Sequence, residues 1–249
     1  MHRLFKYTLL AIVLLCSTGA HAQHYFGVRG GVGSGSSRFY PSQEMGTVWG
    51  LWGGGVSWKF YTSEPYVGGV EVDLLLMQQG FRAYSKTIAQ GVFAGDTTGY
   101  SQRTVNTLMM PIFWQPHMYM FKQRLRVFMN LGITFSYVVS SRERIGSRLN
   151  GVISDEPYRM HITRDNRVGY GLCGGGGVTW IRGRRLELFT EARYYFGYSD
   201  ILVNRTKYEK NPLRSPLDGL QLTIGAYWRM GSGGIRSPQN RPASPPLDE

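Results

Sequence analysis

The stretch Arg124–Tyr137, with the sequence RLRVFMNLGITFSY, decides the fold that we expect for this chain. From Leu125 onward every second residue is apolar, whereas the residues between are mostly small or polar. A period of two indicates an extended strand with one apolar face. An ordinary strand has about five or six residues, and this stretch is longer. It is long enough to cross a bilayer as a tilted strand, which requires about nine to eleven residues. We therefore expect a transmembrane β-strand with its apolar face toward lipid.

The first residues favour export of the chain. Basic residues precede an apolar run from Leu9 to Leu15, and the segment closes on Ala-His-Ala at 20–22. This arrangement is typical of a secretory signal peptide, which we place at residues 1–22 with cleavage before Gln23. The apolar run is too short for a transmembrane helix, and no later run is long enough. Cys173 is then the only cysteine, so no intramolecular disulfide is expected.

Composition points to a closed barrel. The chain has 33 glycines, 14% aromatic residues and a net charge of +12. Glycine and aromatic residues without helical periodicity suit a barrel with crowded inner walls and aromatic girdles at the membrane interfaces. Basic charge can indicate nucleic acid, but export argues against that partner. We expect outer-membrane lipid, in particular the phosphates of lipopolysaccharide, or an acidic protein instead.

The alternating pattern recurs, and it predicts an all-β, eight-stranded antiparallel outer-membrane β-barrel over residues 23–231. Short links at 62–65, 122–124 and 182–184 alternate with longer links at 85–99, 140–167 and 199–216, as between periplasmic turns and outer loops. A Gly-, Pro- and Ser-rich segment at 232–249 is expected to be a disordered periplasmic tail. The eight expected strands are 24–35, 47–61, 66–84, 103–121, 124–137, 168–180, 185–198 and 219–230.

The fourth expected strand contains Pro111 and Pro116. Proline removes a donor from the hydrogen-bond ladder of a sheet and is therefore confined to edges and irregular positions. We predict a bulge or a kink at these prolines.

Short motifs rich in glycine and aromatic residues recur along these strands. They are GVRGGVGSG at 27–35, Val70-Glu71-Val72 with Gln79-Gly80-Phe81, Leu108-x-x-Pro111, Asn130-Leu131-Gly132, the glycines of 168–180, Glu191-Ala192-Arg193-Tyr194-Tyr195 and Ile224-Gly225-x-Tyr227. In these motifs the chain resembles the PorT-type family of small outer-membrane β-barrel proteins over most of 26–230. The resemblance implies the barrel fold and, for some members, a place in the type IX protein secretion machinery. Met230 departs from the family, whose members often end in an aromatic residue.

The inward faces of the expected strands carry both carboxylates and cations. An eight-stranded barrel is only wide enough for side chains to fill it, so we expect no diffusive pore. Buried charges must be neutralised, so we interpret the set as a structural ion network. Acid–base chemistry by paired carboxylates is the alternative. The members are Arg29, Lys59, Glu71, Asp73, Arg126, Glu187, Glu191 and Arg193.

No diagnostic spacing for catalysis or metal binding is present in the sequence. The histidines of the mature chain are His24, His117 and His161. A lipid hydrolase would need a histidine, a serine and an acid together near the outer rim. No set of His, Cys and carboxylates has metal-ligand spacing. We therefore predict a protein that is not an enzyme and has no catalytic or metal site, cofactor or small-molecule substrate.

The turns at 122–124 and 182–184 are basic and contain no acidic residue. An even number of strands places both termini, and these turns, on the periplasmic side. The charge is either general surface charge or a rim that docks an acidic periplasmic partner. This basic rim comprises Lys122, Arg124, Arg182, Arg184, Arg185 and Arg229.

These observations predict a scaffold component of an outer-membrane assembly. The resemblance implies periplasmic or outer-membrane protein partners in the type IX secretion machinery. One alternative is a surface adhesion or binding barrel, whose decisive residues would lie in the outer loops. The other is a lipid-modifying hydrolase, which would lose function on replacement of a single histidine.

Overall fold

The computed structural model describes residues 23–41, 44–61, 68–84, 98–121, 124–182, 185–203 and 214–230. The expected signal peptide and the expected tail lie outside these ranges, so their boundaries stay predictions. Within the part of the chain that the structure describes, no helix is both long and apolar enough to cross a bilayer.

Eleven strands form one antiparallel sheet within these ranges. They are β1 (Gln23–Ser37), β2 (Met45–Gly46), β3 (Val48–Tyr61), β4 (Gly69–Tyr84), β5 (Gly99–Gln115), β6 (His117–Met120), β7 (Leu125–Ser147), β8 (Gly151–Pro157), β9 (Val168–Arg182), β10 (Leu186–Asp200) and β11 (Pro216–Met230).

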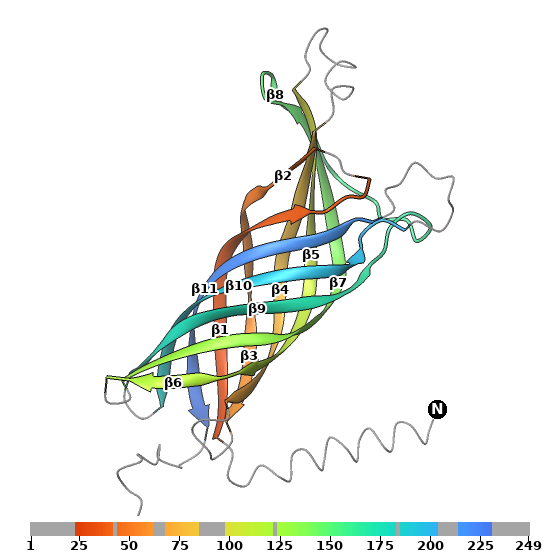
Figure 1. Cartoon of the computed structure of the whole chain (residues 1–249). Coiled ribbons are helices and arrows are strands. Elements are labelled where there is room, and N and C mark those ends of the chain that lie inside the picture. Colours follow the sequence, from red (N-terminus) through yellow and green to blue (C-terminus); the bar gives the residue numbers. More distant parts are fainter. Residues whose placement is uncertain are drawn as a thin grey trace, which may run out of the picture.

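Eight long strands close into a barrel, which confirms the predicted fold class (Figure 1). Neighbours around the ring are β1, β3, β4, β5, β7, β9, β10 and β11. β11 then pairs with β1 along its length, from His24 opposite Met230 to Ser37 opposite Leu217. Closure satisfies the backbone groups that an open sheet edge would leave unpaired, which a bilayer interior requires.

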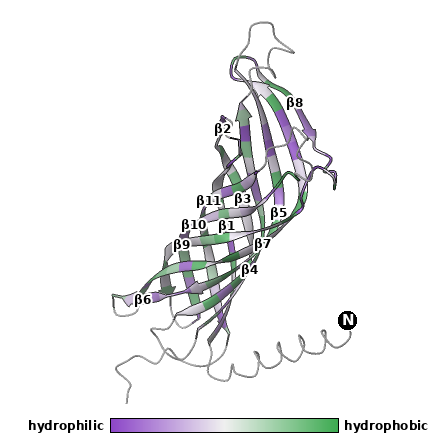
Figure 2. Cartoon of the chain, turned by 45° about the vertical axis from the view of Figure 1, so that its right-hand side comes forward, coloured by the Kyte–Doolittle hydropathy of each residue, from purple (hydrophilic) through white to green (hydrophobic). Residues whose placement is uncertain are grey.

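The barrel wall is apolar outside and polar inside. Large apolar side chains are exposed on every long strand, for example Val28, Leu76, Ile133 and Ile224. Figure 2 shows these hydrophobic residues along the barrel strands, while β8 at the upper end is largely hydrophilic. A belt of exposed apolar side chains of this size is unfavourable in water and suits contact with lipid.

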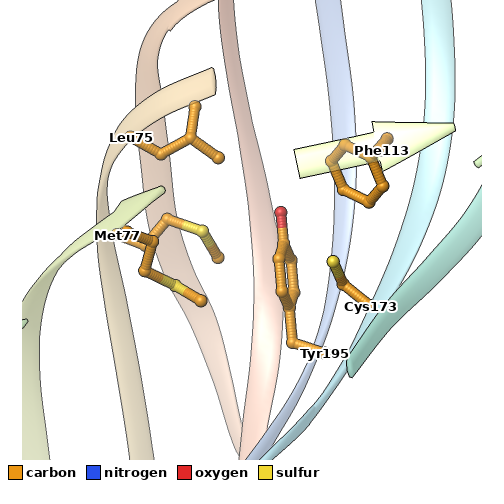
Figure 3. Close-up of a cluster of buried hydrophobic side chains, with 6 residues drawn as sticks. Leu75, Met77, Phe113, Cys173 and Tyr195 are labelled. Atoms are coloured by element: carbon orange, nitrogen blue, oxygen red, sulfur yellow. The ribbon is translucent and has the colours of Figure 1, made fainter. Parts of the chain in front are cut away.

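Three apolar clusters line the interior, and two of them form layers on either side of its middle. Toward the end where β1 begins, the buried aromatic residues of the first layer are Tyr25, Tyr61, Phe128, Phe189 and Tyr227. The second layer lies farther along the barrel and contains Leu75, Met77, Met109, Phe113, Cys173 and Tyr195. Figure 3 shows Tyr195 between Leu75 and Met77 on one side and Phe113 and Cys173 on the other.

Glycines on the inner face of β9 let adjacent strands approach closely. A Cβ atom on Gly175 would lie 2.1 Å from the carbonyl oxygen of Ala192, and one on Gly177 would lie 2.3 Å from that of Thr190. Contacts this short do not occur with real side chains, so larger residues would push β9 and β10 apart. The glycine run thus permits the narrow wall of the barrel.

The prolines of β5 do not shift the register. Pro111 stands opposite Thr134, and the pairing of Trp114 with Leu131 continues in step to His117 with Phe128. The carbonyl of Pro116 accepts a hydrogen bond from the Met129 N–H at 3.0 Å. The predicted bulge is therefore absent at these prolines, although the strand is interrupted at Pro116, where β5 ends and β6 begins. The register shift of this strand pair lies between Asn106 and Thr107, nearer the outer end.

The segment 140–167, expected to be a loop, is largely a hairpin. β7 continues to Ser147, and β8 pairs back against it over Arg142–Ser147. Beyond Tyr137, β8 replaces β9 as the neighbour of β7. This part projects past the barrel mouth (Figure 1). It lacks the apolar alternation by which the other strands were recognised.

Candidate functional site

The barrel interior brings together all eight residues of the predicted ion network. Each is at most 6% exposed. They lie on β1, β3, β4, β7 and β10, and each occupies an inward position because strand side chains alternate. Along β10, Glu191 and Arg193 stand between Phe189 and Tyr195, so the main part of the network separates the two apolar layers.

Two guanidinium groups share three carboxylates at the centre of this layer. Arg193 Nη2 donates to Glu71 Oε1 at 2.6 Å, and Arg29 Nη2 donates to the same oxygen. Arg193 Nη1 donates to Asp73 Oδ2, which also lies 3.2 Å from Arg29 Nη1. Glu191 Oε1 accepts from Arg29 Nη1 at 3.1 Å and pairs with Arg193 Nε. The side chains of three strands, β1, β4 and β10, are thereby joined across the lumen.

Neutral side chains complete the layer, and the sequence analysis missed them. Gln115 Nε2 donates to Glu71 Oε2 at 2.9 Å and to Asn130 Oδ1 at 2.8 Å. Asn130 Nδ2 in turn donates to Glu191 Oε2 at 3.2 Å. Gln115 and Asn130 could have been predicted as lumen residues from their inward positions on alternating strands. Further neutral partners are Ser57, Tyr61 and Tyr227.

The remaining charges lie closer to the end where the chain enters the barrel. Arg126 and Glu187 form a two-pronged pair, with Arg126 Nη1 donating to Oε1 at 3.1 Å and Nη2 donating to Oε2. Lys59 Nζ lies 3.3 Å from Glu71 Oε2 and 3.8 Å from the centre of the Tyr227 ring. A cation over an aromatic face gains electrostatic stabilisation away from water.

The charged side chains form a layer across the lumen. Its four cations and four carboxylates balance, and each side chain is buried among the others. On the outer side of the layer a cavity of about 40 Å³ is lined partly by Thr107, Thr134 and Tyr195. That volume suits a bound water and not a passage for solutes.

The histidines lie at separate places. His24 stacks on Trp58 on the outward face, with ring centres 5.9 Å apart. His117 lies edge-on to Tyr61 at 4.8 Å. His161 is in the outer segment, where its backbone N–H donates to Asp165. Among the described residues, no group of three or more His, Cys, Asp or Glu side chains could hold a metal ion.

Asp165 holds the segment after β8 at the outer end of the barrel. Its carboxylate accepts from Arg103 Nη2 at 2.9 Å and from the Tyr158 hydroxyl at 3.0 Å. Asp165 is 3% exposed, and it forms an isolated bridge with Leu202. This role was not predicted, because Asp165 lies in a charged stretch without periodicity.

The basic rim is divided by the structure. Arg124, Arg182 and Arg185 are exposed at the end of the barrel where β1 begins and β11 ends. Lys122 and Arg184 lie outside the described residues. Arg229 is 5% exposed and shares the inward parity of the buried Tyr227. The prediction that Arg229 belongs to an exposed rim is therefore wrong, because strand alternation turns it inward.

Comparisons with known proteins agree with this architecture. A family model described as "Outer membrane protein beta-barrel domain" matches residues 21–203. No curated protein sequence matches the chain significantly.

Several solved structures are similar to the chain. OprG from Pseudomonas aeruginosa has a TM-score of 0.43 and 13% identity, covering 85% of this chain and 98% of that one. Neisserial surface protein A has a TM-score of 0.41 and 10% identity, with 84% and 99% covered. Ail, the attachment invasion locus protein of Yersinia pestis, has a TM-score of 0.34 and 10% identity over the same shares.

Proposed function

The chain belongs to the outer-membrane protein β-barrel domain family and resides in the outer membrane, and we propose that it is a non-enzymatic, non-conducting scaffold. In this proposal the barrel is a rigid support, and its working surfaces are its two ends. The resemblance of its strand motifs to the PorT-type family favours the type IX protein secretion machinery as the assembly it serves.

The closed ionic layer is the observation that carries this proposal. Two arginines and three carboxylates from different strands neutralise one another where a channel would need open space. Rearranging them would leave charges unpaired away from water, which is costly. A lumen built in this way favours stability over transport or turnover.

Conductance measurements test the closed lumen. Purified protein in planar bilayers is expected to give no steady channels, because side chains fill the interior. A variant with Arg29, Glu71 and Arg193 all replaced by Ala serves as the positive control for opening. Steady large-conductance channels from the unmodified protein would contradict the proposal.

The exposed part of the basic rim supports a periplasmic docking surface. Arg124, Arg182 and Arg185 present positive charge around the short turns. Complementary charge across an interface raises the association rate and fixes register more than it raises affinity. The proposed partner is an acidic periplasmic protein of the same assembly.

Crosslinking in cells tests this docking surface. Replacing Arg182, Arg184 and Arg185 together by Gln should remove crosslinked partners and reduce cargo export, while the barrel still assembles. The matched control replaces Arg142, Arg144 and Arg148, which lie at the opposite end. If the control abolishes export and the rim variant does not, the working surface is the outer one.

A surface-binding role is the second candidate, favoured by the β7–β8 hairpin that projects beyond the barrel mouth. Removing residues 146–152 would shorten this hairpin without touching the lumen layer. Adhesion lost on this deletion, with export unchanged, would favour the second candidate. Loss of function on replacing a single histidine would instead favour a lipid-modifying hydrolase.

A further inference from the structure

A row of polar residues crosses four strands above the apolar belt. Arg82 of β4 stands opposite Gln102 of β5, which stands opposite Arg144 of β7, which stands opposite Asp155 of β8. Directly paired residues in antiparallel strands share one face of a sheet. Arg82 donates to Gln102 at 2.7 Å and Arg144 donates to Asp155 at 2.8 Å, so the row contains two hydrogen-bonded pairs.

This row lies on the outward face of the wall. Arg82 has the same parity on β4 as Leu74 and Leu76, which are exposed. On β7 the odd-numbered residues face outward as far as Val139. Asn106 pairs with Ser140 and Thr107 pairs with Val138, so Val139 is an extra residue in β7 at this point.

The inserted residue changes the outward positions of β7. After the shift the even-numbered residues face out, which brings Arg142 and Arg144 to the outside. Their side chains are 60% and 43% exposed. The bulge therefore converts what would be inward positions into an outward pair of arginines.

Arg142 and Arg144 follow directly after the apolar belt along β7. Tyr137 and Val139 are the last exposed apolar residues of β7, and Ser140 and Ser141 separate them from Arg142. The distance from Val139 to Arg142 is about 10 Å along the strand. Measured along the barrel axis it is shorter, because barrel strands are tilted. The hairpin is at the end opposite the two barrel termini, so in the orientation expected from the even strand number this face lies toward the outer leaflet (Figure 1).

Positive charge is in excess on this sector. Asp155 is the carboxylate paired with Arg142 and Arg144, and Arg148 interacts with Tyr84 and, at longer range, with Glu44. Across the barrel, by contrast, two outer arginines each pair with a carboxylate of their own. Those pairs are Arg38 with Asp218 and Arg214 with Asp200.

We propose that the outward arginine face, defined as Arg82, Arg142, Arg144 and Arg148, binds the phosphate groups of lipid A, the membrane anchor of lipopolysaccharide. Guanidinium groups bind phosphate through paired hydrogen bonds, and the apolar belt directly below accommodates acyl chains. This inference goes beyond the scaffold proposal and depends only on the outer-membrane location and orientation of the barrel. It assigns a place on the barrel to the lipopolysaccharide contact that the net charge predicts.

Native mass spectrometry of the full barrel in a non-ionic detergent tests the site. Bisphosphorylated lipid A, monophosphoryl lipid A and phosphatidylglycerol are titrated separately. The Arg142→Gln/Arg144→Gln variant should bind bisphosphorylated lipid A about tenfold more weakly, because two charge-assisted contacts are lost. The matched control, Arg182→Gln/Arg185→Gln, removes the same charge at the other end and should change affinity less than about twofold.

A second variant tests the same site and is expected to change lipid A affinity in the opposite direction. Asp155→Asn removes the carboxylate that competes for Arg142 and Arg144, and it should raise lipid A affinity severalfold. Equal weakening by the control variant would overturn the proposal, as would unchanged affinity in Asp155→Asn. Phosphatidylglycerol bound as tightly as lipid A would show a general anionic-lipid surface and would also overturn it.

Discussion

The lumen layer and the β7–β8 hairpin use the same arginine–carboxylate pairs in opposite surroundings. Arg193 and Asp73 have side chains that are 0% exposed, whereas those of Arg144 and Asp155 are 43% and 27% exposed. The hydrogen-bond lengths hardly differ, at 2.6 Å for Arg193 with Glu71 and 2.8 Å for Arg144 with Asp155. Distance alone therefore does not separate the two sites.

Burial determines what each site can do. In the lumen an unpaired charge has no water to replace its partner, so each member depends on the others. In the hairpin, water and salt compete with the pair, which is worth little to stability. The buried charges of the lumen are therefore fixed in place, whereas the exposed charges of the hairpin can exchange partners.

The largest effect is expected at Glu71, which contacts Arg29, Lys59 and Arg193. Glu71→Leu should lower the free energy of unfolding by about 3–5 kcal/mol, because it strands buried cations. Urea unfolding in lipid vesicles, followed by the gel mobility difference between boiled and unboiled samples, measures the loss. The same change at the exposed Glu156 is the control. An equal midpoint for both variants would mean that burial does not govern these charges.

The isolated lumen pair gives the next largest effect. Arg126→Met alone should cost about 3 kcal/mol because Glu187 is left buried without its partner. The double variant Arg126→Met/Glu187→Leu should recover at least about 1 kcal/mol of that loss, since no charge is stranded. The same unfolding assay compares them. A double variant less stable than the single one would show that the pair itself stabilises the barrel.

A smaller loss is expected where a neutral residue serves the layer. Asn130→Ala removes hydrogen bonds to Gln115 and Glu191 and should cost about 1–3 kcal/mol. Asn106→Ala, at an exposed hydrogen bond to Ser140, is the control. Unfolding midpoints shifted equally by the two changes would argue against a special role for the buried amide.

The smallest effect is a pH response confined to the hairpin. The hydrogen bond from Arg144 lowers the pKa of Asp155. A lowered folded-state pKa means that the carboxylate's contribution is complete above the ordinary aspartate value and is lost as pH falls through the folded value. Nuclear magnetic resonance titration should therefore show a depressed midpoint in the unmodified protein. Arg144→Gln should return the midpoint toward the ordinary range, with the global unfolding unchanged.

An unchanged titration in Arg144→Gln would mean that Arg142 or the hairpin backbone controls Asp155. Arg144 is expected to have the larger influence on Asp155, because it lies 2.8 Å from the carboxylate and Arg142 lies 3.5 Å from it.

The sequence by itself determined the eight barrel strands, most of their faces and the eight charged residues of the lumen. Alternation is a local property of extended backbone, so the inward position of Glu71 or Arg193 follows from its neighbours along the chain. The same rule would have placed Arg229 inside with Tyr227, had it been applied to the last strand's inner face. The eight-stranded count followed equally from repeated alternation and turn spacing.

Only the tertiary structure decided which of these residues meet. Arg193 and Asp73 come together because closure and register set the heights of β4 and β10, which are not neighbours in the ring. One inserted residue near Val139 reversed the faces of the upper part of β7 and so placed Arg142 outside. Periodicity records the face of a residue, but register depends on contacts between distant strands, and a single bulge reverses every later position.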